Sequence, residues 1–397
     1  MSFNAQFYVD NRRRLAGKLP DSIVFIPAHV RLQQSADMAY PFRQDNNFLY
    51  LTGLHEPDLW MMLDCDKNEA TLLFDEQSDY AKEWEGERDT TDISRRSGIK
   101  RFGSKAELGS LVKRALKQKK TICYLEPAPE RLEPYGFITN PARRFLAESL
   151  KMHATELHDI RLDIARLRQI KQPVELESIQ RAIDITATGL RNTRESLKTF
   201  QNEKDIERFL SAEFYMNGAE GHAYEPIIAG GINAATIHYQ SNDAQIDHKS
   251  LLLLDVGARY DGYAADISRT WAFREPTKRQ TEIFKAVEEL QEIAFSKLKP
   301  GVKLRDYQSE MEKVAADIRK KLGKDVSPFP HGFSHFLGLD VHDAGDYASP
   351  LEPNMVLTVE PGFYFADEHI GIRLEDNIRI TDSGIENMSK QIPKVLY

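Results

Sequence analysis

Two aspartates flank a segment that is predicted to fold back on itself. Asp255 directly follows the apolar run 251–254, and Asp266 lies further along the same stretch. Between them, Asp261 and Gly262 form a dipeptide that is typical of a two-residue hairpin turn. A hairpin with this pair at its tip places the two aspartates on one face as diagonal neighbours, about 7–8 Å apart at Cα. Two carboxylates in that arrangement could share a cation.

A purely structural interpretation of this hairpin is also open. With the turn at its tip, Asp255 lies opposite Ser268, and the aspartates could simply face water. Against this, Asp255 continues a run of four leucines that reads as buried. A carboxylate in such a place needs compensation for its lost hydration, which weakens the structural alternative.

Three further segments carry side chains that could bind a metal. They are the segment from His331 through His335 to His342, the segment Thr358-Val-Glu360-Pro-Gly-Phe-Tyr364, and the segment Gly371-Ile-Arg373-Leu-Glu375-Asp-Asn377. Each has its own structural alternative: a packed histidine cluster, the end of a strand, or the wet face of an edge strand. Taken alone, each segment favours that alternative, but their combination does not.

In the order Asp, Asp, His, Glu, Glu, these blocks closely resemble the metal signature of the pita-bread metallopeptidases, which include methionine aminopeptidase, prolidase and aminopeptidase P. The resemblance implies five ligands, namely Asp255, Asp266, His335, Glu360 and Glu375. Four carboxylates carry about four negative charges, which two divalent cations would neutralise and one would not. We therefore expect two metal ions, with Mn²⁺ as the first choice for this oxygen-rich shell and Co²⁺ or Zn²⁺ as substitutes.

The N-terminal part extends the resemblance to almost the whole chain. The block from Tyr40 to Pro57 looks like the corresponding block of aminopeptidase P. Methionine aminopeptidase generally lacks such a domain, so the resemblance points to enzymes that act on Xaa-Pro bonds. It implies a metal-dependent Xaa-Pro aminopeptidase, with proline-containing peptides as substrates. A prolidase, which cleaves only Xaa-Pro dipeptides, has the same five ligands and stays open, as does a peptide-binding relative without catalysis.

The resemblance also implies roles for side chains around the metals. Asp266 and Glu375 would bridge the two ions, Asp255 would hold one, and His335 with Glu360 would complete the other. Glu360 would also carry a proton from the bridging water toward the leaving proline nitrogen.

Further residues match the family's active site without being ligands. His238 and His342 would orient the substrate and stabilise the tetrahedral intermediate, with His331 nearby. Tyr364 and Arg373 match a supporting pair, in which the arginine would steer ligand carboxylates such as Asp255.

Two domains are expected to position these residues. Residues 1–165 alternate helix-like and strand-like segments, which indicates a smaller α/β domain. Residues 166–397 segregate helices from strands, which indicates an α+β fold, the catalytic pita-bread domain of the resemblance. Its long amphipathic helices are expected at about 174–197, 204–217, 277–298 and 304–322.

Composition limits the possible partners. The chain has 397 residues and a formal net charge of -8, which disfavours broad affinity for nucleic acids or anionic membranes. Only Cys65 and Cys123 are present, and the first residues lack the apolar core of a secretory signal. We expect a cytoplasmic protein. The family resemblance further implies a homodimer or a homotetramer.

Overall fold

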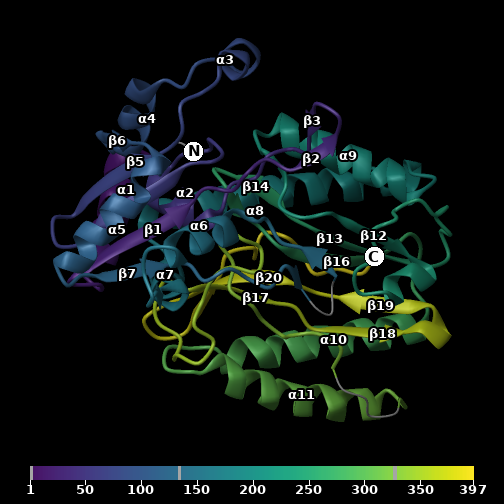
Figure 1. Ribbon diagram of the computed structural model, residues 1–397. Helices are drawn as coiled ribbons and strands as arrows, with labels where there is room; N and C mark the ends of the chain where they lie inside the picture. The colour runs from purple at the N-terminus through teal and green to yellow at the C-terminus, as the bar shows by residue number, and fades with distance from the viewer. Residues whose placement is uncertain (1–2, 133–135, 325–328) are drawn as a thin grey trace. The chain divides into compact units, whose positions relative to one another are not determined.

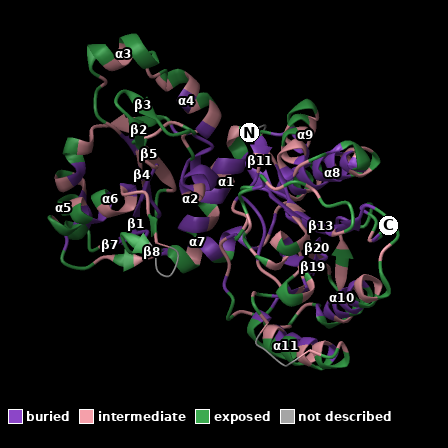
Figure 2. Cartoon of the chain, turned by 90° about the vertical axis from the view of Figure 1, so that its right-hand side faces the viewer, coloured by how far each residue is buried: buried purple, intermediate pink, exposed green. Residues whose placement is uncertain are grey.

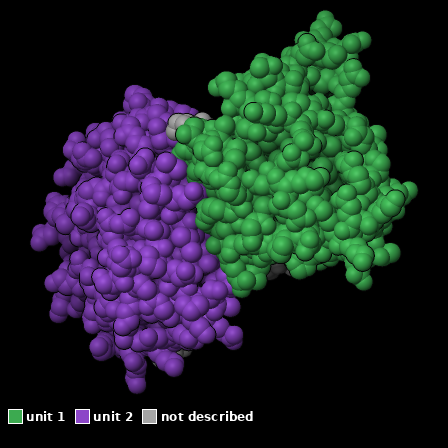
Figure 3. Space-filling model, turned by 90° about the vertical axis from the view of Figure 1, so that its left-hand side faces the viewer, with its two compact units in different colours: residues 1–167 green, residues 168–397 purple. Residues whose placement is uncertain are grey.

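The structure is a computed structural model that describes residues 3–132, 136–324 and 329–397 (Figure 1). The chain forms two compact units, residues 1–167 and residues 168–397, which are coloured separately in Figure 3. The division expected from the sequence lay at 165/166. Among the described residues, no helix combines the length and the apolar character that crossing a bilayer would require.

The first unit is built on a six-stranded mixed sheet in the order β10-β7-β1-β4-β5-β6. Its central strand β1 pairs antiparallel with β4 and parallel with β7. The strands of this sheet are β1 (Ser22–Pro27), β4 (Trp60–Asp64), β5 (Glu69–Leu73), β6 (Arg101–Gly103), β7 (Thr121–Tyr124) and β10 (His158–Asp159). Every residue of β1 is buried, as its apolar sequence predicts for a central strand.

Helices and two small hairpins complete the first unit. The helices are α1 (Ala5–Ala16), α2 (Asn46–Thr52), α3 (Asp79–Glu85), α4 (Thr90–Ser97), the 3₁₀ turn η1 (Lys105–Glu107), α5 (Leu108–Lys117), α6 (Ala142–Lys151) and α7 (Arg161–Arg168). The hairpins are β2 (Gln33–Ser35) with β3 (Met38–Ala39), and β8 (Arg131–Leu132) with β9 (Phe137–Ile138). The predicted α/β character of this part is confirmed.

Four long helices lie in the second unit, close to the ranges expected from their periodicity. They are α8 (Pro173–Glu195), α9 (Glu203–Met216), α10 (Lys278–Lys297) and α11 (Leu304–Lys321). Pro173 occupies the first turn of α8, and Gln172 and Glu175 form a reciprocal capping box there. The short 3₁₀ turns are η2 (Leu197–Thr199), η3 (Gly231–Ala235) and η4 (Ala366–Glu368).

The strands of the second unit form small antiparallel sheets, in the orders β11-β14-β15, β12-β13-β16, β17-β20-β21 and β18-β19. Their bounds are β11 (Gly221–His222), β12 (Ile227–Gly230), β13 (Leu251–Val256), β14 (Ala258–Tyr260), β15 (Tyr263–Ala264), β16 (Ile267–Ala272), β17 (Val356–Val359), β18 (Gly362–Phe365), β19 (Ile370–Arg373), β20 (Asp376–Ile380) and β21 (Ile385–Asn387). A large apolar cluster joins α10 and α11 to β17–β20. These helices therefore bury one face and expose the other (Figure 2). The α+β fold expected for this unit is confirmed.

The register predicted for the aspartate hairpin is confirmed. Asp255 lies opposite Ser268, and the turn residues Asp261 and Gly262 have φ values of 49° and 80°. Positive φ at both turn positions is the requirement of a type I′ turn. Gly257 is needed for a different reason, because a Cβ there would lie 1.8 Å from the carbonyl oxygen of Ala265. The hairpin therefore has no room for a side chain at this point between the two aspartates.

Candidate active site

The five predicted ligands come from five separate points of the second unit. Asp255 lies on β13, Asp266 directly precedes β16, and His335 lies in an irregular loop. Glu360 directly follows β17, and Glu375 lies between β19 and β20. Strands or strand ends place the four carboxylates, so the sheets act as a rigid frame for a group that is distant in sequence.

The structure brings these side chains together. Ligand atoms of Asp266, His335 and Glu375 all lie within 4.8 Å of one another. Nε2 of His335 lies 3.4 Å from Oδ2 of Asp266 and 3.4 Å from Oε1 of Glu360. Asp255 joins the group through a tyrosine, as described next.

Tyr224 connects the two aspartates. Its hydroxyl oxygen lies 2.6 Å from Oδ1 of Asp255 and 2.6 Å from Oδ1 of Asp266. Burial, followed by these two negative charges, raises the pKa of Tyr224 well above its usual value. The hydroxyl can donate its one proton to only one carboxylate at a time. Because a hydroxyl is neutral, it does not compensate the negative charges of the two aspartates. Sequence reasoning missed Tyr224, because it lies in an irregular segment before β12 with no motif around it.

Arg373 supplies the nearest fixed positive charge. Its guanidinium is buried and donates from Nη2 to Oδ2 of Asp255 at 2.5 Å, and from Nη1 to the Tyr364 hydroxyl at 2.9 Å. Nε donates to Oγ of Ser268 at 2.8 Å, and this hydroxyl in turn donates to Oε2 of Glu375 at 2.8 Å. A single planar side chain therefore holds groups from three strands in place.

His335 is oriented as a metal ligand requires. Nδ1 lies 3.0 Å from the carbonyl oxygen of Phe336, to which it donates as N–H. This arrangement leaves the Nε2 lone pair directed at the carboxylates. Burial disfavours the imidazolium, but Asp266 and Glu360 outweigh it and raise the pKa of His335 to about 9. In the absence of metal, a proton thus occupies the position where a cation would bind.

The carboxylates themselves are short of positive charge. Burial raises the pKa of Glu360 to about 7 and raises that of Glu375 well above its usual range, with Asp266 adding to both shifts through its charge. The pKa of Asp266 is raised as well, chiefly by burial. Divalent cations would remove this repulsion between four neighbouring carboxylates. The donor set therefore fits two hard or borderline divalent ions.

The three predicted histidines differ in burial and in their contacts. Nε2 of His331 lies 2.8 Å from the Tyr364 hydroxyl, and the ring of His342 stands edge-on to that of His335 with centroids 4.2 Å apart. His238 is exposed. Burial lowers the pKa of His331 and of His342 to about 4, and His238 adds to both shifts. These two histidines are therefore neutral at pH 7.

The loop that carries His238 is held by one buried carboxylate. Glu203, at the start of α9, accepts from Gly230 N at 2.8 Å and from Tyr239 Oη at 2.7 Å. It also accepts from Ala244 N at 3.1 Å, and from Asn233 Nδ2 at 3.0 Å. The glutamate is 1% exposed. Sequence reasoning missed this role, because an acid in the first turn of a helix is ordinary.

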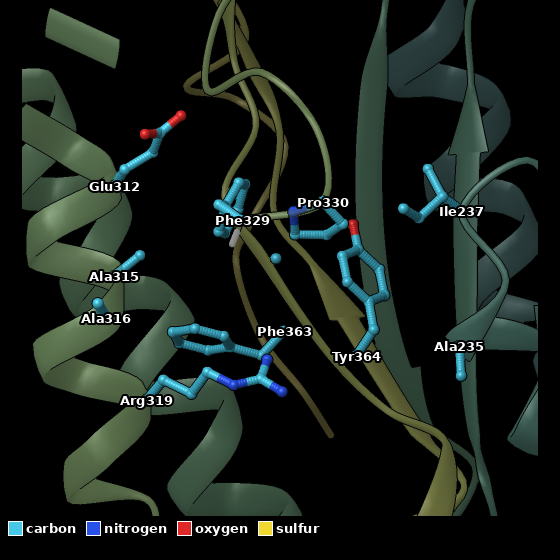
Figure 4. A pocket seen from close by; sticks show the side chains of 11 residues that line it. Ala235, Ile237, Glu312, Ala315, Ala316, Arg319, Phe329, Pro330, Phe363 and Tyr364 are labelled. Carbon is cyan, nitrogen blue, oxygen red and sulfur yellow. The ribbon is translucent and has the colours of Figure 1, made fainter. Parts of the chain in front are cut away.

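A pocket of about 170 Å³ opens beside Tyr364. Figure 4 shows α11 forming one wall, with Ala315 and Ala316 between the charged side chains of Glu312 and Arg319. The remaining lining residues are Ala235, Ile237, Phe329, Pro330, Gly362 and Phe363. Its walls combine apolar side chains with the charged groups of Glu312 and Arg319, and they adjoin both the His238 loop and the chain leading to His331.

The chain belongs to metallopeptidase family M24, whose model matches residues 177–382. Within that family it resembles aminopeptidase P, and the model of the aminopeptidase P N-terminal domain matches residues 8–124. The Xaa-Pro aminopeptidase of Escherichia coli K12 is 32% identical over 94% of this chain and 92% of its own length. Human Xaa-Pro aminopeptidase 3 is 30% identical over 94% of this chain and 79% of its own. The predicted family is confirmed.

Solved structures agree along the whole length. Aminopeptidase P from E. coli with the inhibitor Pro-Leu superposes with a TM-score of 0.86 at 30% identity, covering 100% of this chain and 97% of the other. The zinc-substituted form of that enzyme, in complex with product, gives a TM-score of 0.82 with the same coverage. The fold of both units is thus that of aminopeptidase P.

Proposed function

We propose that this protein is a dinuclear metal-dependent aminopeptidase that releases the N-terminal residue from peptides with proline at the second position. The observation that carries the proposal is the convergence of four carboxylates and one imidazole, with Arg373 as their nearest buried cation. The relatives named Xaa-Pro aminopeptidase, which align with 94% of the chain, support the choice of substrate.

Two divalent ions, for which Mn²⁺ is our first choice and Co²⁺ or Zn²⁺ the substitutes, would lower the pKa of a bound water and polarise the scissile carbonyl. We assign Asp266 and Glu375 to both ions and Asp255 to one of them. His335 and Glu360 complete the set on the other. The structure supports these assignments because Nδ1 of His335 bonds to a backbone carbonyl while Nε2 faces Asp266 and Glu360.

Glu360 is assigned the proton transfer. Its Oε1 accepts from the Thr358 hydroxyl at 3.2 Å and faces Nε2 of His335, whereas Oε2 lies 3.5 Å from Nδ1 of His331. We propose that Oε2 of Glu360 accepts the proton that the attacking water releases. The same proton then passes to the leaving proline nitrogen. A carboxylate held between His335 and His331 is placed to accept a proton and to return it.

His238 and His342 are assigned to substrate orientation and to the charge that develops on the carbonyl oxygen, with His331 nearby. A neutral imidazole can donate one hydrogen bond without adding charge to the site. His331 already contacts Tyr364, which itself accepts from Arg373. This chain of contacts fixes the ring of His331 beside the pocket.

The pocket explains how a proline peptide could be accepted. Proline has no amide N–H and a fixed φ, so a site that grips an extended backbone loses a contact and meets a rigid ring. An apolar wall such as that formed by Phe363, Tyr364 and Pro330 offers packing in place of the missing hydrogen bond. We propose that apolar groups on the leaving side of the substrate bind there.

Hydrolysis of a matched peptide panel tests this function. We expect Xaa-Pro-Yaa tripeptides to be cleaved with Mn²⁺, Xaa-Ala-Yaa controls to be resistant, and activity to vanish with a chelator and return with Mn²⁺. Cleavage of the Xaa-Pro dipeptide alone would instead define a prolidase. Full activity of metal-free protein would exclude the mechanism, and no hydrolysis of any peptide would favour a binding protein.

We also propose a homodimer or homotetramer, as in the family. One observation supports a further contact surface: helix α3 buries none of its residues, and on it Tyr80 and Trp84 stack at 5.3 Å while 64% and 67% exposed. Exposed aromatic pairs are typical of interfaces. Sedimentation velocity tests the proposal. We expect an oligomer that the Trp84→Ser variant weakens, and a wild-type monomer would contradict it.

A further inference from the structure

One buried glutamine lies behind the site without contacting it. Gln291 belongs to α10, on the face that packs into the large apolar cluster beside Val287, Leu290 and Ala294. The residue is 0% exposed. Burying an amide among apolar side chains is unfavourable unless hydrogen bonds replace its water. The position therefore requires a specific reason for glutamine.

That reason is a pair of backbone carbonyls. Nε2 of Gln291 donates to the oxygen of Val359 at 3.1 Å and to the oxygen of Leu374 at 3.0 Å. Val359 is the residue before Glu360, and Leu374 is the residue before Glu375. One amide group thus connects the two chain segments that carry the glutamates.

The carbonyl of Val359 and the N–H of Glu360 belong to one peptide unit. In the same way, the carbonyl of Leu374 and the N–H of Glu375 belong to another. A peptide unit is planar, so fixing its oxygen and its N–H fixes the attachment point of the next side chain. The N–H of Glu360 donates to Phe333 O at 3.1 Å, and the N–H of Glu375 donates to Ser268 O at 3.1 Å. Both peptide planes are therefore held at both ends, and Gln291 is the group they share.

The side chain works as a donor. Its oxygen Oε1 has no hydrogen-bond partner among the described residues, whereas both protons of Nε2 are used. An apolar side chain of equal length would fill the space but hold neither carbonyl. A glutamate would turn carboxylate oxygens toward two carbonyl oxygens and add charge behind an acidic site.

We infer that Gln291 is a positioning residue, which sets the spacing between Glu360 and Glu375 and thereby the affinity of the site for divalent metal. The inference rests on the proposed function, because it takes both glutamates as ligands. Groups that orient metal ligands from behind typically change metal affinity or activity by about 10–100-fold when they are removed.

Calorimetric titration of metal-free protein with Mn²⁺ tests the inference. For Gln291→Met, which keeps the length of the side chain and removes both donors, we expect binding about 10–100-fold weaker than wild type. Ile283→Ala is the matched control. It removes apolar contact from the same helix and cluster, at a residue 0% exposed, and should lower the thermal midpoint without weakening Mn²⁺ binding.

A second variant guards against loss of folding. Gln291→Asn keeps the amide but is shorter by one methylene, so it can reach only one carbonyl and should bind Mn²⁺ with intermediate affinity. Wild-type affinity in both Gln291 variants, or an equal loss in Ile283→Ala, would overturn the inference. If wild-type protein itself binds no Mn²⁺, the proposed function fails and the inference with it, which is a distinguishable result.

Discussion

The guanidinium of Arg373 donates from Nη2 to Oδ2 of Asp255 at 2.5 Å, although 118 positions separate the two residues. The pair is almost fully shielded, with side chains 3% and 13% exposed. An arginine held in this way fixes the direction of a carboxylate that we assign to the metals. Without metal, two other acids of the cluster share the proton of His335, whose Nε2 lies 3.4 Å from both Asp266 and Glu360.

Arg373→Lys is expected to reduce kcat/KM by about 100-fold or more at saturating Mn²⁺. Lysine keeps the charge but cannot hold Asp255, Tyr364 and Ser268 at once, and small misplacements near reacting groups cost about that much. Arg379→Lys is the matched control, because that arginine pairs with Glu386 at the surface. Equal activity in the two variants would contradict the assigned role.

Tyr224→Phe is expected to destabilise the metal-free protein by about 1.5–3 kcal/mol, the range for hydrogen bonds to charged groups. The lost hydroxyl bridges Asp255 and Asp266, which would then face each other without it. Urea unfolding in the presence of a chelator measures the effect. Tyr40→Phe, at an exposed position, should leave stability unchanged. Unchanged stability of Tyr224→Phe would mean that the tyrosine hydroxyl does not stabilise the two neighbouring aspartates.

The stability of the metal-free protein is expected to fall as pH rises from 6.5 to 9. Burial opposes the His335 imidazolium, but Asp266 and Glu360 prevail and raise the pKa of His335 from 6.5 to about 9. The folded protein therefore holds a proton that the unfolded chain releases. Its contribution is complete below pH 6.5 and is lost as pH passes through 9. His331 and His342 act mainly below this window, because folding lowers their pKa values from 6.5 to about 4 and therefore costs stability as pH falls below 6.5.

Unfolding by urea at pH 6.5 and pH 9 measures this difference, which we expect to be roughly 1–3 kcal/mol for the chelated protein. Saturating Mn²⁺ should reverse the sign, because metal binding displaces the protons and is favoured at higher pH. Constant stability of the metal-free protein across this window would show that His335 does not share a proton with the acidic cluster.

Glu203→Gln is expected to reduce kcat/KM by roughly 10–100-fold, because the loop carrying His238 would shift. A glutamine cannot accept at all four donors, so at least one of the contacts from Gly230, Asn233, Tyr239 and Ala244 is lost. Mn²⁺ affinity should stay unchanged, since none of the five ligands lies on this loop. Glu213→Gln on the same helix is the control, and equal activity of both variants would contradict the prediction.

Much of this site could be predicted because its signals are local. The Asp261-Gly262 turn determines the register of the hairpin, and the register places Asp255 and Asp266 on one face. Glu360 lies at the strand end that its Pro-Gly neighbours indicate, whereas Glu375 is buried and not on the wet face of an edge strand. The long helices followed from periodicity, which reports the buried face of a helix directly.

The supporting residues could not be predicted, because their partners are remote in sequence. Gln291 reads as one more polar residue on an amphipathic helix, and its two contacts lie 68 and 83 positions away. Tyr224 and Glu203 meet their partners across 31–42 and 27–41 positions, respectively. Turn chemistry and periodicity describe a residue's own element, and neither reports which element folds against it.

The most direct measurement is diffraction at the manganese absorption edge from crystals grown with Mn²⁺. We expect two anomalous peaks, each within bonding distance of carboxylate oxygens, with Nε2 of His335 on one of them and Asp255 on the other. A single peak, or none, with the five side chains facing an empty cavity, would contradict the dinuclear site on which the proposed activity depends.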